Sequence, residues 1–201
     1  VETYVLAAGT QTFTLGATGQ NVTADSTGAT GAITIDTSTF TSVTGIFDDN
    51  TGDDTIALTL SQDGVNISSA NTTDVDTIAL ANNVGATMTR VQDAKINAAS
   101  GTNTVTLTDA GAVTGNANVE TYVLADGGGT TFTLGADAQN VTTGNGADTI
   151  DVGTRTATGT FTTVAADTIK LGDGADVTGV DSGAGAGGAF TANNLTLASG
   201  A

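Results

Sequence analysis

The sequence predicts an all-β fold and, within that class, a parallel β-solenoid of short stacked rungs. Three observations support this prediction. Apolar, β-branched segments recur along the chain, usually 8–11 residues apart, and Thr alternates with apolar residues within them, as in Thr102–Thr108. A segment of the chain is repeated, which favours stacked repeats. Pro is absent, so every backbone N–H can join a strand ladder.

The repeated segment covers Val1–Thr23 and Val119–Thr142, with 18 aligned residues identical and one extra residue in the second Gly-rich turn. Each copy reads as two short strands, Tyr4–Leu6 and Phe13–Leu15 in the first, joined by small residues. About 12 strand intervals separate the copies, which divides evenly into turns of two or three strands. We therefore expect Tyr4 and Tyr122 to occupy equivalent positions, on the same side of their strands.

Two other structural interpretations fit part of this pattern. An antiparallel β-sandwich of Greek-key or immunoglobulin type also has short, evenly spaced strands. Disorder is suggested by the net charge of −17 and the low complexity, but regular β-type spacing argues against it. Within a solenoid we expect one repetitive domain over residues 1–180, a Gly-rich loop or linker over 181–188, and the start of a further strand unit over 189–201.

Composition limits the function classes. The chain holds 21 acidic residues against 4 basic ones, which argues against nucleic acid or an anionic membrane as a partner. It has no Cys and no His, which removes disulfides, the usual zinc ligands and a Ser-His-Asp triad. No apolar run is long enough for membrane insertion. Without His and with few basic residues, we do not expect an enzyme. Because the chain starts inside a repeat and without Met, we expect a fragment of something longer.

Acidic turns precede several of the expected strands. The motif Asp-Thr-Ile occurs four times, at Asp54, Asp76, Asp148 and Asp167. Calcium takes 6–8 oxygen ligands from carboxylates and backbone carbonyls, and stacked turns with Gly bring both groups together. We therefore predict Ca²⁺ ligands in two places, Asp148, Asp173 and Asp176 with the carbonyls of Gly144 and Gly146, and a second cluster at Asp48, Asp49, Asp53 and Asp54. The alternative interpretation is that each Asp caps its turn by accepting from nearby backbone N–H groups.

The stretch Thr143–Asp151 reads TGNGADTID and matches the nonapeptide G-G-x-G-x-D-x-U-x except at its first Gly. Here the chain resembles the RTX-type calcium-binding proteins, which include S-layer proteins and giant adhesins of Gram-negative bacteria. The resemblance is specific over these nine residues, and the neighbouring turns carry degenerate versions. It implies calcium binding, secretion and a place on the bacterial cell surface.

We accordingly expect a structural segment of a secreted, extracellular, calcium-stabilised cell-surface protein, of S-layer or adhesin type, that self-associates into an array or filament. Cell-surface polysaccharide is a further partner that this setting suggests. A carbohydrate-active or carbohydrate-binding β-helix is the alternative function, because paired carboxylates can serve glycoside chemistry. Thr-x-Thr pairs such as Thr104 and Thr106 resemble ice-binding ranks, but Thr is also an ordinary outward-facing strand residue.

Overall fold

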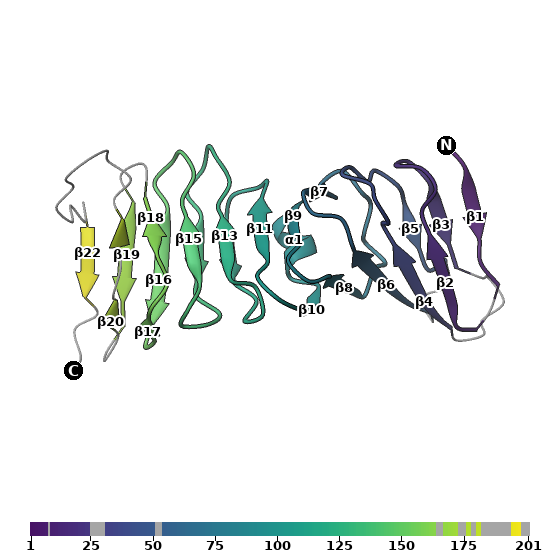
Figure 1. Ribbon diagram of the computed structural model, residues 1–201. Helices are drawn as coiled ribbons and strands as arrows, with labels where there is room; N and C mark the ends of the chain where they lie inside the picture. Colours follow the sequence, from purple (N-terminus) through teal and green to yellow (C-terminus); the bar gives the residue numbers. More distant parts are fainter. Residues whose placement is uncertain are drawn as a thin grey trace. The chain divides into compact units, whose positions relative to one another are not determined.

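The computed structural model describes residues 1–7, 9–24, 31–50, 54–163, 167–172, 176–177, 180–181 and 194–197. It is an all-β parallel solenoid of stacked rungs with almost no helix, as the sequence predicted. Strands are paired in parallel in both halves of the chain, for example β1 with β3 and β13 with β15, which rules out the antiparallel sandwich. The chain divides into two compact units, Val1–Asn103 and Thr104–Ala201. Each is described separately (Figure 1).

The first unit is built on two long columns of parallel strands. One column has the order β1-β3-β5 and the other β10-β8-β6-β4-β2, with β7 and β9 paired beside them. From β1 to β6 successive strands alternate between the two columns, and a strand pairs with the strand one rung later, as β2 does with β4 and β4 with β6. The elements are β1 (Thr3–Val5), β2 (Gln11–Thr14), β3 (Asn21–Thr23), β4 (Ala32–Asp36), β5 (Phe47–Asp48), β6 (Thr55–Leu60), β7 (Val65–Asn66), β8 (Thr77–Leu80), β9 (Gly85–Met88), α1 (Arg90–Asp93) and β10 (Ile96–Ala99).

The second unit repeats this plan. Its columns have the orders β11-β13-β15-β18-β21 and β12-β14-β16-β19-β22, and β17 pairs with β20. The strands are β11 (Thr104–Leu107), β12 (Ala112–Thr114), β13 (Thr121–Val123), β14 (Thr131–Thr133), β15 (Asn140–Thr142), β16 (Thr149–Gly153), β17 (Thr156–Ala157), β18 (Phe161–Thr162), β19 (Thr168–Leu171), β20 (Asp176–Val177), β21 (Val180–Asp181) and β22 (Asn194–Leu197).

Apolar residues at every second position form the core of each unit. In β6, Ile56, Leu58 and Leu60 are buried while the Thr and Ala between them are more exposed, which is the period-2 pattern of a strand with one buried face. Each rung stacks its apolar residue on that of the next, as Phe132 does on Ile150 and Ile150 on Ile169. The core is therefore a set of continuous apolar rows, and it needs few aromatic side chains.

The two copies of the repeat have the same internal geometry. Tyr4 is registered with Val22 and Tyr122 with Val141, and these partners are themselves equivalent in the repeat. The ring of Tyr4 lies 4.9 Å from Phe13 at 48°, and the ring of Tyr122 lies 4.7 Å from Phe132 at 51°. The two copies therefore share their strand register and their ring geometry. The burial of the two Tyr side chains differs, however: Tyr4 is 37% exposed and Tyr122 is 0% exposed.

The helix α1 is a single turn with a complete capping box. The Thr89 hydroxyl accepts from the Gln92 N–H over 3.3 Å, and the Gln92 side chain accepts from the Thr89 N–H over 2.9 Å. Gln92 is buried and also donates to the carbonyls of Ile67 and Ala70, which fixes the turn on the rung below. No helix among the described residues is long and apolar enough to cross a membrane.

The predicted boundaries near the C-terminus are described only in part. Asp181, the first residue of the expected linker at 181–188, belongs to β21, which pairs with β18. Within the expected further unit at 189–201, β22 pairs in parallel with β19 and so continues the second column of the second unit. The other residues of both ranges lie outside the described part, so these boundaries stay predictions.

Candidate functional site

Carboxylates of the Asp-Thr-Ile motif bond the rung that precedes them. Asp76 Oδ2 accepts from the Ile56 N–H over 2.8 Å, 20 residues earlier in the chain. Asp148 Oδ1 accepts from the Thr130 N–H over 2.6 Å, and Asp167 Oδ1 accepts from the Asp148 N–H over 2.8 Å. Three of the four motif Asp residues thus form charge-assisted hydrogen bonds between rungs. This is a capping role of the kind that the sequence left open, directed at the neighbouring rung.

Asp148 is the most enclosed of these carboxylates. It is 1% exposed, and its second oxygen accepts from the Gly144 N–H over 3.2 Å. Burial raises the pKa of Asp148, the bonds from Thr130 and Gly144 lower it, and the negative charges of Asp167 and Asp126 raise it further. The net direction is upward, which shows that two N–H donors do not fully replace the water that this carboxylate has lost.

Asp54, the fourth Asp of the motif, accepts no hydrogen bond from a described backbone N–H. Its side chain is 6% exposed, and neither carboxylate oxygen has a hydrogen bond to a described residue. A Cβ placed on Gly31 would lie 2.8 Å from Asp54 Oδ1 and 2.8 Å from the Gly9 carbonyl oxygen. The space beside Gly31 therefore brings a buried, unpaired carboxylate oxygen close to a backbone carbonyl, which is the ligand chemistry of a hard cation.

A cluster of three carboxylates lies elsewhere in the first unit. One carboxylate oxygen from each of Asp48, Asp49 and Asp74 lies within 4.8 Å of the others. Asp48 ends β5 and also accepts from the Asn50 N–H over 2.8 Å, which shapes the turn after the strand. We call this group the three-Asp cluster.

Lys95 fixes the loop that carries Asp74. Its ammonium donates to the carbonyls of Thr72, Thr73 and Val75 over 2.7, 2.8 and 2.7 Å. These three carbonyls are therefore already committed to a cation of the chain itself.

The predicted ligands fall into separate places. Asp48 and Asp49 converge with Asp74, whereas Asp54 lies apart from them beside Gly31. Gly144 contributes its N–H to Asp148, and Gly146 adopts a φ of 151°, which favours Gly. Asp53 and Asp173 lie outside the described residues, and for Asp176 only its strand, β20, is described. Calcium binding at each of these residues stays a prediction.

The donor set at the three-Asp cluster fits Ca²⁺, because one carboxylate oxygen from each of three residues converges there without a nitrogen or sulfur ligand. Asp148 fits less directly, because both of its oxygens already accept from N–H groups. Sequence reasoning missed Asp74 and Lys95. Asp74 lies 25 residues after Asp49, close to one rung later, so the repeat length was the signal that could have found it.

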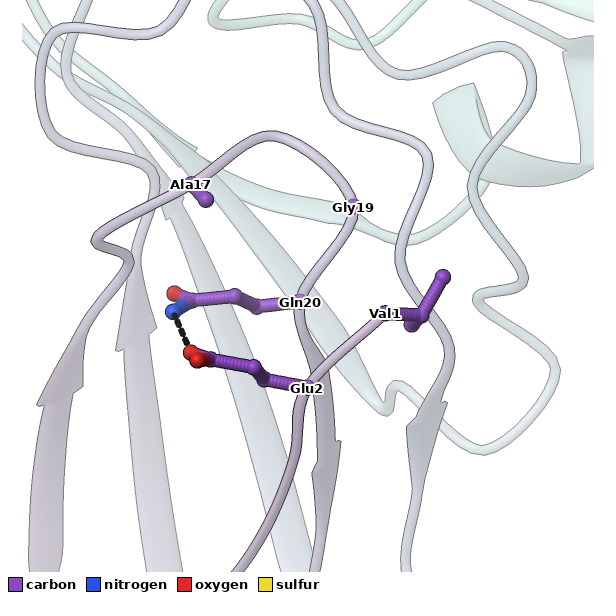
Figure 2. A pocket seen from close by; sticks show the side chains of 5 residues that line it. All are labelled: Val1, Glu2, Ala17, Gly19 and Gln20. Carbon is purple, nitrogen blue, oxygen red and sulfur yellow. Dashed lines mark hydrogen bonds between the residues drawn. The ribbon is translucent and has the colours of Figure 1, made fainter.

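A second feature is a hollow of about 310 Å³ at the start of the first unit, lined by Val1, Glu2, Ala17, Gly19 and Gln20 (Figure 2). Gln20 Nε2 donates to Glu2 Oε2 over 3.4 Å across it, and the Tyr4 hydroxyl donates to the same oxygen over 2.7 Å. The hollow is small, and among the described residues that line it Glu2 is the acidic one.

Comparison of the chain with protein-family models, with curated protein sequences and with solved structures finds no match. The functional proposal therefore depends on the solenoid fold, the acidic residues and the hollow described above.

Proposed function

We propose that this chain is a structural segment of a secreted, calcium-stabilised cell-surface protein, of the S-layer or adhesin type, that acts through self-assembly. The three-Asp cluster is the observation that carries the proposal. Its carboxylates come from different parts of the chain, so an ion bound there would tie Asp48 and Asp49, at the end of β5, to Asp74, in the loop before β8.

Three further observations support the proposal. The net charge of −17 creates repulsion that a divalent cation would offset. The buried Asp148 and Asp167 bond backbone N–H groups of the preceding rung, which is a structural use of acidic side chains. The resemblance of Thr143–Asp151 to the RTX nonapeptide is consistent with a parallel solenoid stabilised by calcium.

The proposal predicts that calcium raises the melting temperature. A metal that binds only the folded chain stabilises it by about 2.7 kcal/mol at a hundredfold excess over its dissociation constant. Thermal melts would be recorded in calcium, in magnesium and in chelator at one ionic strength, so that screening of the charge is constant. We expect magnesium to substitute poorly, because it demands a tighter octahedral geometry.

Substitutions of single Asp residues test which carboxylates bind the ion. Asp49→Asn and Asp74→Asn should each reduce the calcium response of the melt. The matched control is Asp137→Asn, which removes the same charge at a side chain that is 56% exposed and forms a surface ion pair with Arg155. Asp148→Ala tests the motif turn in the second unit. Coincident melts of the unmodified chain in calcium and in chelator would contradict the calcium part of the proposal.

Binding to carbohydrate stays a prediction of the sequence, with no structural observation in its favour. Titration with cell-surface oligosaccharides, followed by NMR, tests it directly. An ordered, saturable site would favour the carbohydrate-binding alternative over a purely structural role.

A further inference from the structure

Three residues of the first unit meet at one point between stacked rungs. Gly9, Gly31 and Asp54 lie just before β2, β4 and β6, which are neighbouring parallel strands (Figure 1). The Thr55 N–H donates to the Gly31 carbonyl over 2.9 Å, which holds Asp54 against Gly31. A Cβ on Gly31 would lie 2.8 Å from Asp54 Oδ1 and 2.8 Å from the Gly9 carbonyl oxygen. Both oxygens therefore border the same small space.

The second unit shows what a carboxylate at this place in a rung ordinarily bonds. There the Thr149 N–H donates to the Thr130 carbonyl over 2.7 Å, so the backbone follows the same plan. The Thr130 N–H donates to Asp148 Oδ1 over 2.6 Å, and the Gly144 N–H donates to Asp148 Oδ2 over 3.2 Å. The chain itself thus supplies a donor for each oxygen of Asp148.

Asp54 takes the corresponding place without such donors. It is 6% exposed, and neither of its oxygens has a hydrogen bond to a described residue. A carboxylate that has left water and gained no partner is costly, and buried polar groups are therefore almost always bonded. The burial of Asp54 thus calls for a positive partner that comes from solution.

Gly31 provides the space for that partner. Its φ is not positive, so the backbone conformation does not require glycine at this position. A side chain would instead collide with Asp54 Oδ1 and with the Gly9 carbonyl oxygen. The missing side chain leaves a space between an anionic oxygen and a carbonyl oxygen, which are the two kinds of ligand that calcium takes from proteins.

We propose that Asp54 binds a calcium ion in this space, with the Gly9 carbonyl as a second ligand. The ion would neutralise the buried carboxylate and join the rungs that carry β2 and β6 across the rung that carries β4. This inference rests on the proposed calcium stabilisation and adds a site apart from the three-Asp cluster.

The assignment differs from what the RTX resemblance implies. The resemblance points to Asp148, within Thr143–Asp151, where both carboxylate oxygens already accept from N–H groups. The geometry favours Asp54, because its oxygens are buried and lack such donors.

Calorimetric titration with calcium chloride tests the site. The chain would carry Asp49→Asn and Asp74→Asn, which disable the three-Asp cluster, and Asp54→Asn would be added to it. We expect the added substitution to weaken one calcium site about tenfold or more, because it removes the charged ligand. Asp76→Asn is the matched control, since it changes the same motif position at an oxygen that accepts from the Ile56 N–H.

Thermal melts of Asp54→Asn in the same background provide a second measurement with a change of sign. In chelator the variant should melt above its parent, because it removes a buried charge that has no partner. In saturating calcium it should melt below its parent, because the ion no longer stabilises the fold. A variant that melts below its parent by the same amount in both solutions would overturn the proposal.

Gly31→Ala fills the proposed site without changing a charge. Its matched control is Gly129→Ala, because a Cβ on Gly129 would also lie 2.8 Å from a backbone carbonyl oxygen, that of Ala147, with no carboxylate beside it. We expect the calcium affinity to fall about tenfold or more in Gly31→Ala, because ligand geometry sets the affinity, and to stay unchanged in Gly129→Ala. Circular dichroism confirms that both variants are folded.

Two calorimetric outcomes would overturn the proposal. One is a calcium isotherm that Asp54→Asn leaves unchanged. The other is an equal loss of affinity in Gly31→Ala and Gly129→Ala, which would trace the loss to the backbone collision. Because the background lacks the three-Asp cluster, a failure of the cluster is seen in comparison with the unmodified chain, and a failure at Asp54 is seen within the background.

Discussion

The two copies of the repeat are nearly the same in sequence and differ in environment. Tyr4 and Phe13 form the same tilted ring pair as Tyr122 and Phe132, at almost the same distance. Yet Tyr122 and Phe132 are 0% exposed, whereas Tyr4 is exposed and Phe13 is half-buried. Local geometry is therefore set within a rung, while burial is set by the preceding rung. Matched substitutions in the two copies measure the contribution of that neighbour.

The largest difference is expected for the aromatic core residues. Phe132→Ala should lower the free energy of unfolding by about 3–5 kcal/mol, because the side chain is fully buried and a cavity remains. Phe13→Ala should cost about 1–2 kcal/mol, since the side chain is already partly in water. Urea unfolding followed by circular dichroism measures both. Equal losses would show that the first copy is covered in solution.

Gln139→Ala should be more destabilising than Gln20→Ala. Gln139 is 1% exposed and bonds the N–H of Gly135 and the carbonyls of Asn116 and Val119, and its loss would remove these three bonds. We expect a cost of about 1–3 kcal/mol. Gln20 keeps the equivalent bond from the Gly16 N–H, but its other contacts are long bonds to side chains, so the cost should be smaller. Thermal melts of both variants test this order, and a reversed order would contradict it.

A smaller difference is expected for the Tyr hydroxyls. Tyr122→Phe leaves the Asn116 N–H without its acceptor and should cost about 1 kcal/mol. Tyr4→Phe removes a bond to an exposed Glu2 carboxylate and should leave the melting temperature nearly unchanged. If Tyr4→Phe lowers the melting temperature as much as Tyr122→Phe does, the hydrogen bond from Tyr4 to Glu2 stabilises the fold more than its exposure indicates.

The smallest effect is expected in the pKa of the Glu2 carboxyl, which a titration measures. The hydrogen bond from Tyr4, and then that from Gln20, lowers the pKa of the Glu2 carboxyl, and the bond to Glu2 raises the pKa of Tyr4. A lowered carboxyl pKa means that the bond stabilises the fold above the usual Glu range and that this contribution is lost as pH falls through the folded-state pKa. NMR titration should find Glu2 below its ordinary value, and Tyr4→Phe should return it toward that value. An unchanged pKa in Tyr4→Phe would contradict the assignment.

The sequence was sufficient to predict the fold. Strand spacing, the alternation of apolar and polar residues and the repeat all reflect how a single rung is built. It was less informative about the candidate metal site. Asp48 and Asp49 were identified from a local run of acids, but Asp74 joins them from another rung, and only the register brings it there. Asp148 was predicted as a ligand from a local motif, and the structure shows its oxygens bonded to the N–H groups of Thr130 and Gly144. Contacts between rungs depend on where turns insert residues, which local patterns do not report.

The carboxylates that bond between rungs have a consequence for how such a chain can change in length. Asp76, Asp148, Asp167 and the amide of Asn103 each accept from a backbone N–H that lies 18–20 residues earlier. Because the acceptor and its donor are one rung apart in these four cases, an in-frame duplication or deletion of one whole rung leaves these acceptors facing a backbone N–H. Recombination within the gene can therefore add or remove rungs without creating an unpaired buried carboxylate. A turn can also gain a residue without loss of register, because Tyr4 and Tyr122 keep equivalent partners although the second copy of the repeat is one residue longer.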